Sequence, residues 1–151
     1  MTSNETNELL KAISFAADKH RFQRRKDTEK TPYINHPVNV ALTLSEIGGV
    51  DELTLLVAAV LHDTIEDTDT APEEIARLFG KDVLAIVLEV TDDKTLPKEE
   101  RKKLQVLHAP HKSDPAKKLK LADKICNISD IISHPPGNWD TARKLDYLKW
   151  A

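Results

Sequence analysis

Apolar residues recur every three or four positions along most of the chain, and no stretch alternates apolar and polar residues as a strand does. Only 4 Gly occur in the 151 residues. The pattern predicts an all-α protein, a bundle of about eight helices. The expected helices cover residues 5–20, 37–48, 53–61, 71–80, 81–91, 97–107, 115–133 and 139–151.

Residues at the helix ends indicate where these helices begin and end. Pro37 suits a first helical turn, whereas Gly48-Gly49 and Gly80 permit the left-handed backbone that often follows a helix. Residues 53–61 are almost all apolar, so we expect this helix to be the most buried. Residues 21–32 lose the helical period and predict an exposed loop. The expected N-caps are Asp51, Thr70 (in a Thr-x-x-Glu capping box), Asp114 and Asn138.

Length and composition predict one soluble domain over residues 1–151. A chain of this size buries roughly two-thirds of its unfolded surface, and 40% hydrophobic with 31% charged residues is typical of a globular protein. No apolar run approaches the ~20 residues that cross a bilayer, and residues 1–7 are polar rather than a signal sequence. We therefore expect a cytoplasmic protein without a membrane partner. The single Cys126 has no internal disulfide partner, and we expect it to be buried and inert.

The net charge of -3 argues against general nucleic-acid binding, which depends on neutralising many phosphates. Basic residues nevertheless gather in three places, at residues 21–26, 98–103 and 112–124. Such clusters suit solvated helix faces, and they also suit a local pocket for a small polyanion. The sequence leaves both readings open.

Four side chains are candidates for chemistry because each lies at or within an otherwise apolar helical pattern: His36, the pair His62-Asp63, and Asp123. A charged Asp in such a place is costly unless it is paired or binds a cation. Any one of them alone is most often structural. Together, two imidazoles and two carboxylates form a mixed ligand set suited to Mn²⁺, Fe²⁺ or Zn²⁺.

A second cluster is acidic. Glu66 and Asp67 follow Asp63 by three and four residues, so on a helix the three carboxylates share one face. Like charges this close repel one another unless a metal or a proton compensates. A solvated acidic helix end is the alternative interpretation.

Four segments, in order, resemble one known family. His36, His62-Asp63 and Asp123 are similar to the H…HD…D signature of the HD superfamily, and residues 61–68, LHDTIEDT, resemble the HDxxED motif of the RelA/SpoT hydrolase domain. Residues 24–37 and 90–97 resemble the small alarmone hydrolases, including their metazoan SpoT-like members. The likeness extends from about residue 9 to residue 150.

This resemblance implies an HD-domain helical bundle with one Mn²⁺ ion per chain. The implied metal ligands are His36, His62, Asp63 and Asp123, and the implied catalytic residues are Glu66 and Asp67, which would orient or deprotonate the attacking water. The family reaction is hydrolysis of the 3′-pyrophosphate of (p)ppGpp to GDP or GTP and pyrophosphate. A bound metal and a nearby carboxylate suit that chemistry.

The resemblance also points to substrate-binding residues. Arg25 and Lys26 match family residues that hold the nucleotide, and Asn127 matches one that lines the nucleoside pocket. Lys98 is a further phosphate candidate. Trp139, Arg143 and Tyr147 recur every four residues along the last predicted helix, a stripe that suits core packing or the border of a nucleotide site. The expected substrate-binding residues are Arg25, Lys26, Lys98, Asn127, Arg143 and Tyr147.

Three alternatives remain open from the sequence. The same site could act on ppApp or on the 2′-phosphate of NADPH, because base choice depends on hydrogen bonds at the purine edge. An HD-type nucleotidase would not be expected to carry the Glu66-Asp67 pair, and a nucleotide-binding regulator without catalysis would not need the complete ligand set. The chain ends within a predicted helix, where the resembling proteins continue, and we expect neither alarmone synthesis nor ribosome binding. The oligomeric state stays open.

Overall fold

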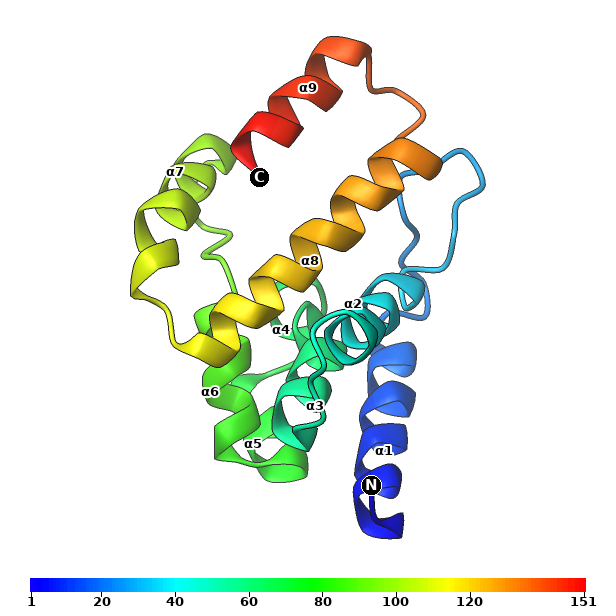
Figure 1. Cartoon of the computed structure of the whole chain (residues 1–151), viewed down its shortest axis with the longest axis vertical. Coiled ribbons are helices and arrows are strands. Elements are labelled where there is room, and N and C mark those ends of the chain that lie inside the picture. Colours follow the sequence, from blue (N-terminus) through cyan, green and yellow to red (C-terminus); the bar gives the residue numbers. More distant parts are fainter.

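The computed structural model describes residues 1–151, and its regular structure is helical (Figure 1). The predicted all-α fold is confirmed, and the strand-like pairing is limited to two isolated bridges, Arg24 with Pro32 and Asp27 with Pro136. A four-residue helix directly after His62-Asp63 was not predicted as a separate element. The helices are α1 (Ser3–Lys19), α2 (Asn35–Glu46), α3 (Leu53–Leu61), α4 (Thr64–Asp67), α5 (Pro72–Phe79), α6 (Lys81–Glu89), α7 (Lys98–His108), the 3-10 turn η1 (Ala109–His111), α8 (Asp114–Ser133) and α9 (Thr141–Trp150).

Helix α3 is the centre of the core, as its apolar run predicted. Residues 55–61 are all buried, and the helix packs against α1, α2, α6 and α8. Ala12 and Ala16 of α1 have no exposed surface and allow that helix to approach closely, while Leu119 of α8 fills the other side. In Figure 1, α8 crosses the molecule, with α7 and α9 beyond one of its sides and α1 to α3 beyond the other. No helix is both long enough and apolar enough to cross a membrane.

The predicted N-caps were wrong by one or two residues. Helix α3 begins after Glu52 and α5 after Ala71, and neither residue makes a side-chain capping bond. Ser113 caps α8, and Asp140 caps α9 by accepting from the Arg143 backbone N–H at 2.9 Å. At α8 and α9 two side chains that can cap lie near the start of the helix, and the one that was not predicted accepts from the first turn. At α3 and α5 the N-cap is the residue after the predicted one, and its side chain does not cap. The residues that were predicted to act as caps are Asp51, Thr70, Asp114 and Asn138.

The two helix ends that were predicted at glycine agree with the structure better than the predicted N-caps do. Gly80 follows α5 with φ of 96°, and Gly49 follows α2 with φ of 63°, both in the left-handed region that favours glycine. Trp139 lies before the start of α9 instead of within it, so the stripe predicted along the last helix is shorter than expected.

The loop between α1 and α2 is non-helical, as predicted, but it is built around a buried carboxylate. Asp27 is 5% exposed and accepts from the backbone N–H of Thr31 at 2.9 Å and from its hydroxyl. The Gly137 N–H donates to the Lys26 carbonyl at 3.1 Å, which ties the loop to the segment after α8. The loop therefore holds its basic residues in one place beside α8. Cys126 of that helix is buried, as expected, with its sulfur 3.3 Å from the Thr43 hydroxyl.

Candidate functional site

The four predicted metal ligands come together from three helices. His36 lies in the first turn of α2, His62 and Asp63 directly follow α3, and Asp123 lies in the middle of α8. His36 Nε2 is 2.9 Å from Asp123 Oδ1 and 3.8 Å from Asp63 Oδ2. His62 Nε2 is 3.1 Å from Asp63 Oδ2 and 3.5 Å from Asp123 Oδ1. All four side chains therefore present nitrogen or oxygen atoms to one small volume.

The ring of His62 has the orientation of a metal ligand. Its Nδ1 is 2.6 Å from the Ala59 carbonyl oxygen, and because a carbonyl only accepts, this contact assigns the ring proton to Nδ1. In the neutral ring Nε2 then carries a lone pair, and this atom is buried without a hydrogen bond of its own. Metal-binding histidines usually donate their second ring N–H in this way. The Nε2 atom of His62 is therefore suited to bind a cation together with His36 and Asp123.

The electrostatics of the cluster also require positive charge. Asp63 and Asp123 keep only 16% and 13% of their side-chain surface exposed. Burial acts to lower the pKa of His62, yet the two carboxylates outweigh burial and hold that pKa well above its ordinary value. Burial likewise acts to raise the pKa of Asp123, and the two histidines outweigh it, so its pKa lies well below the usual range. A divalent cation would supply the charge that this cluster demands.

Helix α4 places the two predicted catalytic carboxylates beside this cluster. Glu66 Oε1 accepts from the backbone N–H of Asp92 at 2.6 Å. Burial raises the pKa of Glu66 to about 7; the Asp92 N–H opposes this shift, and the nearby carboxylates add to it. Asp67 instead forms an ion pair with Lys94. The two neighbouring acids are therefore in different electrostatic states.

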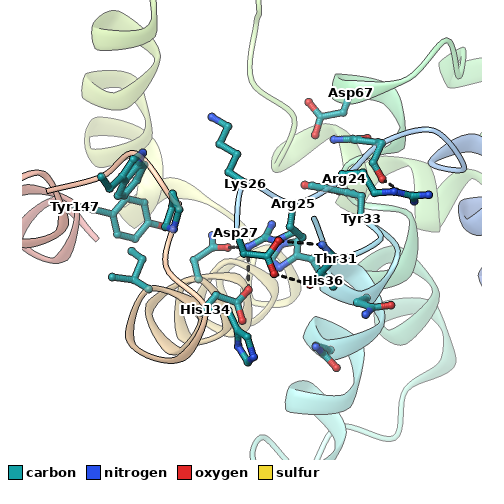
Figure 2. Close-up of a pocket in the computed structure, with 18 of the residues that line it drawn as sticks. Arg24, Arg25, Lys26, Asp27, Thr31, Tyr33, His36, Asp67, His134 and Tyr147 are labelled. Carbon is teal, nitrogen blue, oxygen red and sulfur yellow. Dashed lines mark hydrogen bonds and ion pairs between the residues drawn. The ribbon is translucent and has the colours of Figure 1, made fainter. Parts of the chain in front are cut away.

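Two adjoining hollows open over the cluster, one of about 730 Å³ and one of about 300 Å³. Figure 2 shows the larger, with Tyr33 and Tyr147 on opposite sides and the Lys26 side chain extended between them. The smaller hollow contains His62, Asp63, Glu66 and Asp123. The residues that line both are Arg25, Tyr33, His36, Asp67, Asn127, Trp139 and Tyr147.

The structure brings most of the predicted substrate-binding residues to these hollows. Arg25, Asn127 and Tyr147 line both, Lys26 lines the larger, and Lys98 lines the smaller. Arg143 lines neither, and its guanidinium lies 4.4 Å from the centre of the Trp139 ring.

The Arg25 guanidinium is fixed by α8 and by an aromatic ring. Its Nη2 donates to Asp130 Oδ2 at 2.9 Å and to Asn127 Oδ1 at 3.4 Å, and its guanidinium carbon is 5.5 Å from the centre of the Tyr33 ring. Tyr33 in turn donates its hydroxyl to Asp63 Oδ2 at 2.6 Å. Tyr33 therefore joins the metal cluster to the larger hollow, a role that the sequence did not indicate.

Several cations line one wall of the smaller hollow, and of these the sequence singled out Lys98 alone. The second and third basic clusters converge there, with α7 on one side and α8 on the other (Figure 1). Lys124 Nζ is 3.4 Å from the centre of the Trp150 ring, and burial lowers its pKa to about 8. Helical spacing within each cluster was the available signal, because residues three or four apart share a face. The basic residues of this wall are Lys98, Arg101, Lys102, Lys120 and Lys124.

Comparison with known proteins gives the family. The HD domain matches residues 12–148. The guanosine-3′,5′-bis(diphosphate) 3′-pyrophosphohydrolase MESH1 of Xenopus tropicalis is 56% identical over 149 residues, which cover 99% of this chain and 83% of that protein. The Homo sapiens protein of the same name is 53% identical over 148 residues, which cover 98% of this chain and 83% of that protein. A solved structure of a metazoan orthologue of SpoT that hydrolyses ppGpp matches with a TM-score of 0.92 at 45% identity, covering 95% of this chain and 80% of that chain. With this geometry and this degree of identity, the chain belongs to the HD-domain family and, within it, to the alarmone hydrolases related to SpoT.

Proposed function

We propose that the chain hydrolyses the 3′-pyrophosphate of (p)ppGpp, giving GDP or GTP and pyrophosphate, and so ends or tunes an alarmone signal. Residues 1–151 would act as one catalytic domain. The observation that carries this proposal is the position of Glu66, a half-buried carboxylate in the same hollow as the His and Asp cluster and a wall of cations. The 56% identical relative named for this reaction supports the same substrate class.

We propose His36, His62, Asp63 and Asp123 as the ligands of one Mn²⁺ ion per chain. The mixed nitrogen and oxygen donors suit Mn²⁺, and the free Nε2 of His62 supports the fit. When bound, such a cation lowers the pKa of water and offsets charge on phosphoryl oxygens. Tyr33, by its hydrogen bond to Asp63, orients that carboxylate within the cluster.

Glu66 is the proposed general base. A water molecule adds to the phosphorus bonded to the ribose 3′ oxygen, the bond between that phosphorus and the 3′ oxygen breaks, and the 3′ oxygen takes up a proton from solvent as it leaves. Glu66 accepts the proton that the water loses. A pKa of about 7 leaves a large fraction of this carboxylate ionised at neutral pH while keeping it basic. Asp67, whose charge is balanced by Lys94, orients the water instead of accepting its proton.

The two hollows divide substrate recognition between them. In the larger, the planar Arg25 guanidinium and the Tyr147 ring offer surfaces for a purine, and Asn127 offers hydrogen bonds. Lys26 is exposed there and free to meet phosphate. In the smaller, Lys98 and the other cations of the wall neutralise the remaining phosphate charge. Arg143 would act indirectly, by supporting the Trp139 ring.

The test is a product-resolved turnover assay with metal-depleted protein reloaded with Mn²⁺. Substrates would be ppGpp, ppApp and NADPH, separated from their products by ion-exchange chromatography. We expect GDP and pyrophosphate in equal amounts from ppGpp, and no reaction with a chelator present. Release of single phosphates from ppGpp, or faster turnover of ppApp or NADPH, would contradict the proposal. Parallel reloading with Zn²⁺, Fe²⁺ or Mg²⁺ tests the choice of Mn²⁺.

We also propose that the chain acts in the cytoplasm, where a dissolved nucleotide substrate would reach it. A tagged chain should follow a cytosolic marker on fractionation of its own cells. Recovery with membranes or in the medium would contradict this location.

A further inference from the structure

The connection between α6 and α7 contacts both carboxylates of α4, and only its Lys94 has a role in the proposed function. Its Asp92 donates a backbone N–H to Glu66 Oε1 at 2.6 Å, and its Lys94 pairs with Asp67. This connection lies within residues 90–97, one of the segments that carried the family resemblance. A single short segment therefore contacts the proposed base and its neighbour.

The same connection is itself held in place. The Asp92 carboxylate accepts from Gln105 Nε2 of α7 at 2.5 Å. Asp93 Oδ1 accepts from the Thr95 N–H at 2.9 Å and from its hydroxyl at 2.6 Å, which forms a tight turn. The backbone N–H of Asp92 is therefore aimed by contacts on both sides of it.

Gln105 is the side chain of α7 that reaches this connection. Its amide oxygen is buried without a partner, so among protein groups its amide is oriented by Asp92 alone. Helix α7 has no buried residue. It contacts α9 through Lys102, whose carbonyl accepts from the Trp150 indole N–H at 3.2 Å and whose ammonium lies 4.8 Å from the centre of the Trp150 ring. The Gln105 contact thus links a lightly packed helix, which carries phosphate-facing cations, to the proposed base.

We infer that Gln105 and Asp92 are positioning residues for Glu66: Gln105 holds the Asp92 carboxylate, and Asp92 directs its backbone N–H at one oxygen of Glu66. The second oxygen of Glu66 is then left to accept the proton from water. This inference rests on the proposed function, because it takes Glu66 as the base. It extends that function by joining the helix that meets the phosphates to the group that moves the proton.

The expected effect is on turnover and not on binding. A base displaced by a fraction of an ångström still lets substrate bind but transfers the proton less efficiently. Gln105→Met keeps the length of the side chain and removes the donor. It should lower kcat about tenfold with KM changed less than about twofold.

Further variants isolate the hydrogen bond. Gln105→Lys restores a donor to Asp92 and should keep most of the wild-type kcat. Val106→Met places the same new side chain at the neighbouring, solvent-exposed position of α7 and should leave kcat and KM unchanged. Asp92→Ala is measured alone and combined with Gln105→Met, and the double variant should be no slower than the slower of the two single variants, because both act through one contact.

Each variant would be measured for kcat and KM with ppGpp at fixed Mn²⁺, and for Mn²⁺ affinity and melting temperature. Unchanged kcat in Gln105→Met would overturn the inference, as would a loss in Gln105→Lys equal to that in Gln105→Met. A rise in KM alone would assign α7 to phosphate binding only. Glu66→Gln is measured alongside: full activity there would refute the base itself, whereas its inactivity with full activity in Gln105→Met would refute this inference alone.

Discussion

The Nδ1–H of His62 donates to the carbonyl oxygen of Ala59 at 2.6 Å, within the last turn of α3. This backbone contact fixes the plane of the imidazole ring, so Nε2 faces His36 and Asp123 whatever occupies the cluster. The most buried helix of the protein thereby sets the direction of one proposed ligand. The protein prepares this ligand through folding, without needing a cation to turn the ring.

The proposed ligands should be required together. Asp123→Asn keeps the size of the side chain but removes its charge, and we expect Mn²⁺-dependent hydrolysis to fall at least about 100-fold. Circular dichroism should show unchanged helicity. Asp82→Asn, an exposed acid of α6, is the control and should keep full activity. Undiminished activity in Asp123→Asn, or activity insensitive to chelation, would show that the metal site has been misplaced.

The acids of α4 should affect chemistry more than binding. Glu66→Gln preserves size and removes the base, so kcat should fall by ~10²–10⁴ with a small change in KM. Asp67→Asn should cost less, because that carboxylate is already paired with Lys94. Steady-state kinetics on ppGpp would separate the two constants. A change confined to KM would make these residues walls of the pocket.

The raised pKa of Glu66 predicts an acid limb in the pH profile. The base works as the carboxylate, so kcat/KM should rise with pH and level off near the pKa of about 7. A cation in the neighbouring cluster favours the ionised form and moves this limb to lower pH. We would measure kcat/KM from pH 5 to 8 at saturating Mn²⁺. An identical limb in Glu66→Gln would assign it to another group.

The sequence predicted those parts of the fold and of the candidate site that depend on neighbouring residues. The apolar run of residues 53–61 identified the central helix, because a helix that is buried on all sides is apolar at nearly every position. His36 and Asp123 were candidates because each lies at or within an otherwise apolar helical pattern, and the resemblance to the H…HD…D signature then supported them. The caps failed because Ser113 and Asp114 are both good caps, and the choice between them depends on backbone geometry.

Contacts between distant segments could not be read from the sequence in the same way. Nothing in the residues near Arg25 indicates that Asp130 will fix its guanidinium, since the two are brought together only by the packing of the loop on α8. The wall of cations likewise forms only where α7 and α8 meet. Lys124 was therefore overlooked, whereas Arg143 was expected in the pocket and lies behind Trp139.

Arg25 provides a test of the nucleotide. Arg25→Lys keeps the charge but loses the flat guanidinium and its two contacts to α8, so kcat/KM for ppGpp should fall about tenfold, which corresponds to about 1.4 kcal/mol. A small pyrophosphate ester without a base should be cleaved equally well by both proteins. Equal losses on the two substrates would mean that Arg25 supports the fold or the metal cluster instead.

Lys124 predicts an alkaline limb in the same profile. Burial, reinforced by Lys120, lowers its pKa to about 8, so above that pH the ammonium loses the charge that attracts phosphate, and kcat/KM for ppGpp should decline. Tyr147 does not account for such a decline, because burial raises its pKa to about 12. Lys124→Arg stays charged and can still lie on the Trp150 ring, so its kcat/KM should remain flat to about pH 9.5. Lys124→Met should have a lower kcat/KM than the wild type below about pH 8 and should show no alkaline limb. An unchanged alkaline limb in Lys124→Arg would show that another group controls it and that Lys124 meets solvent instead of phosphate.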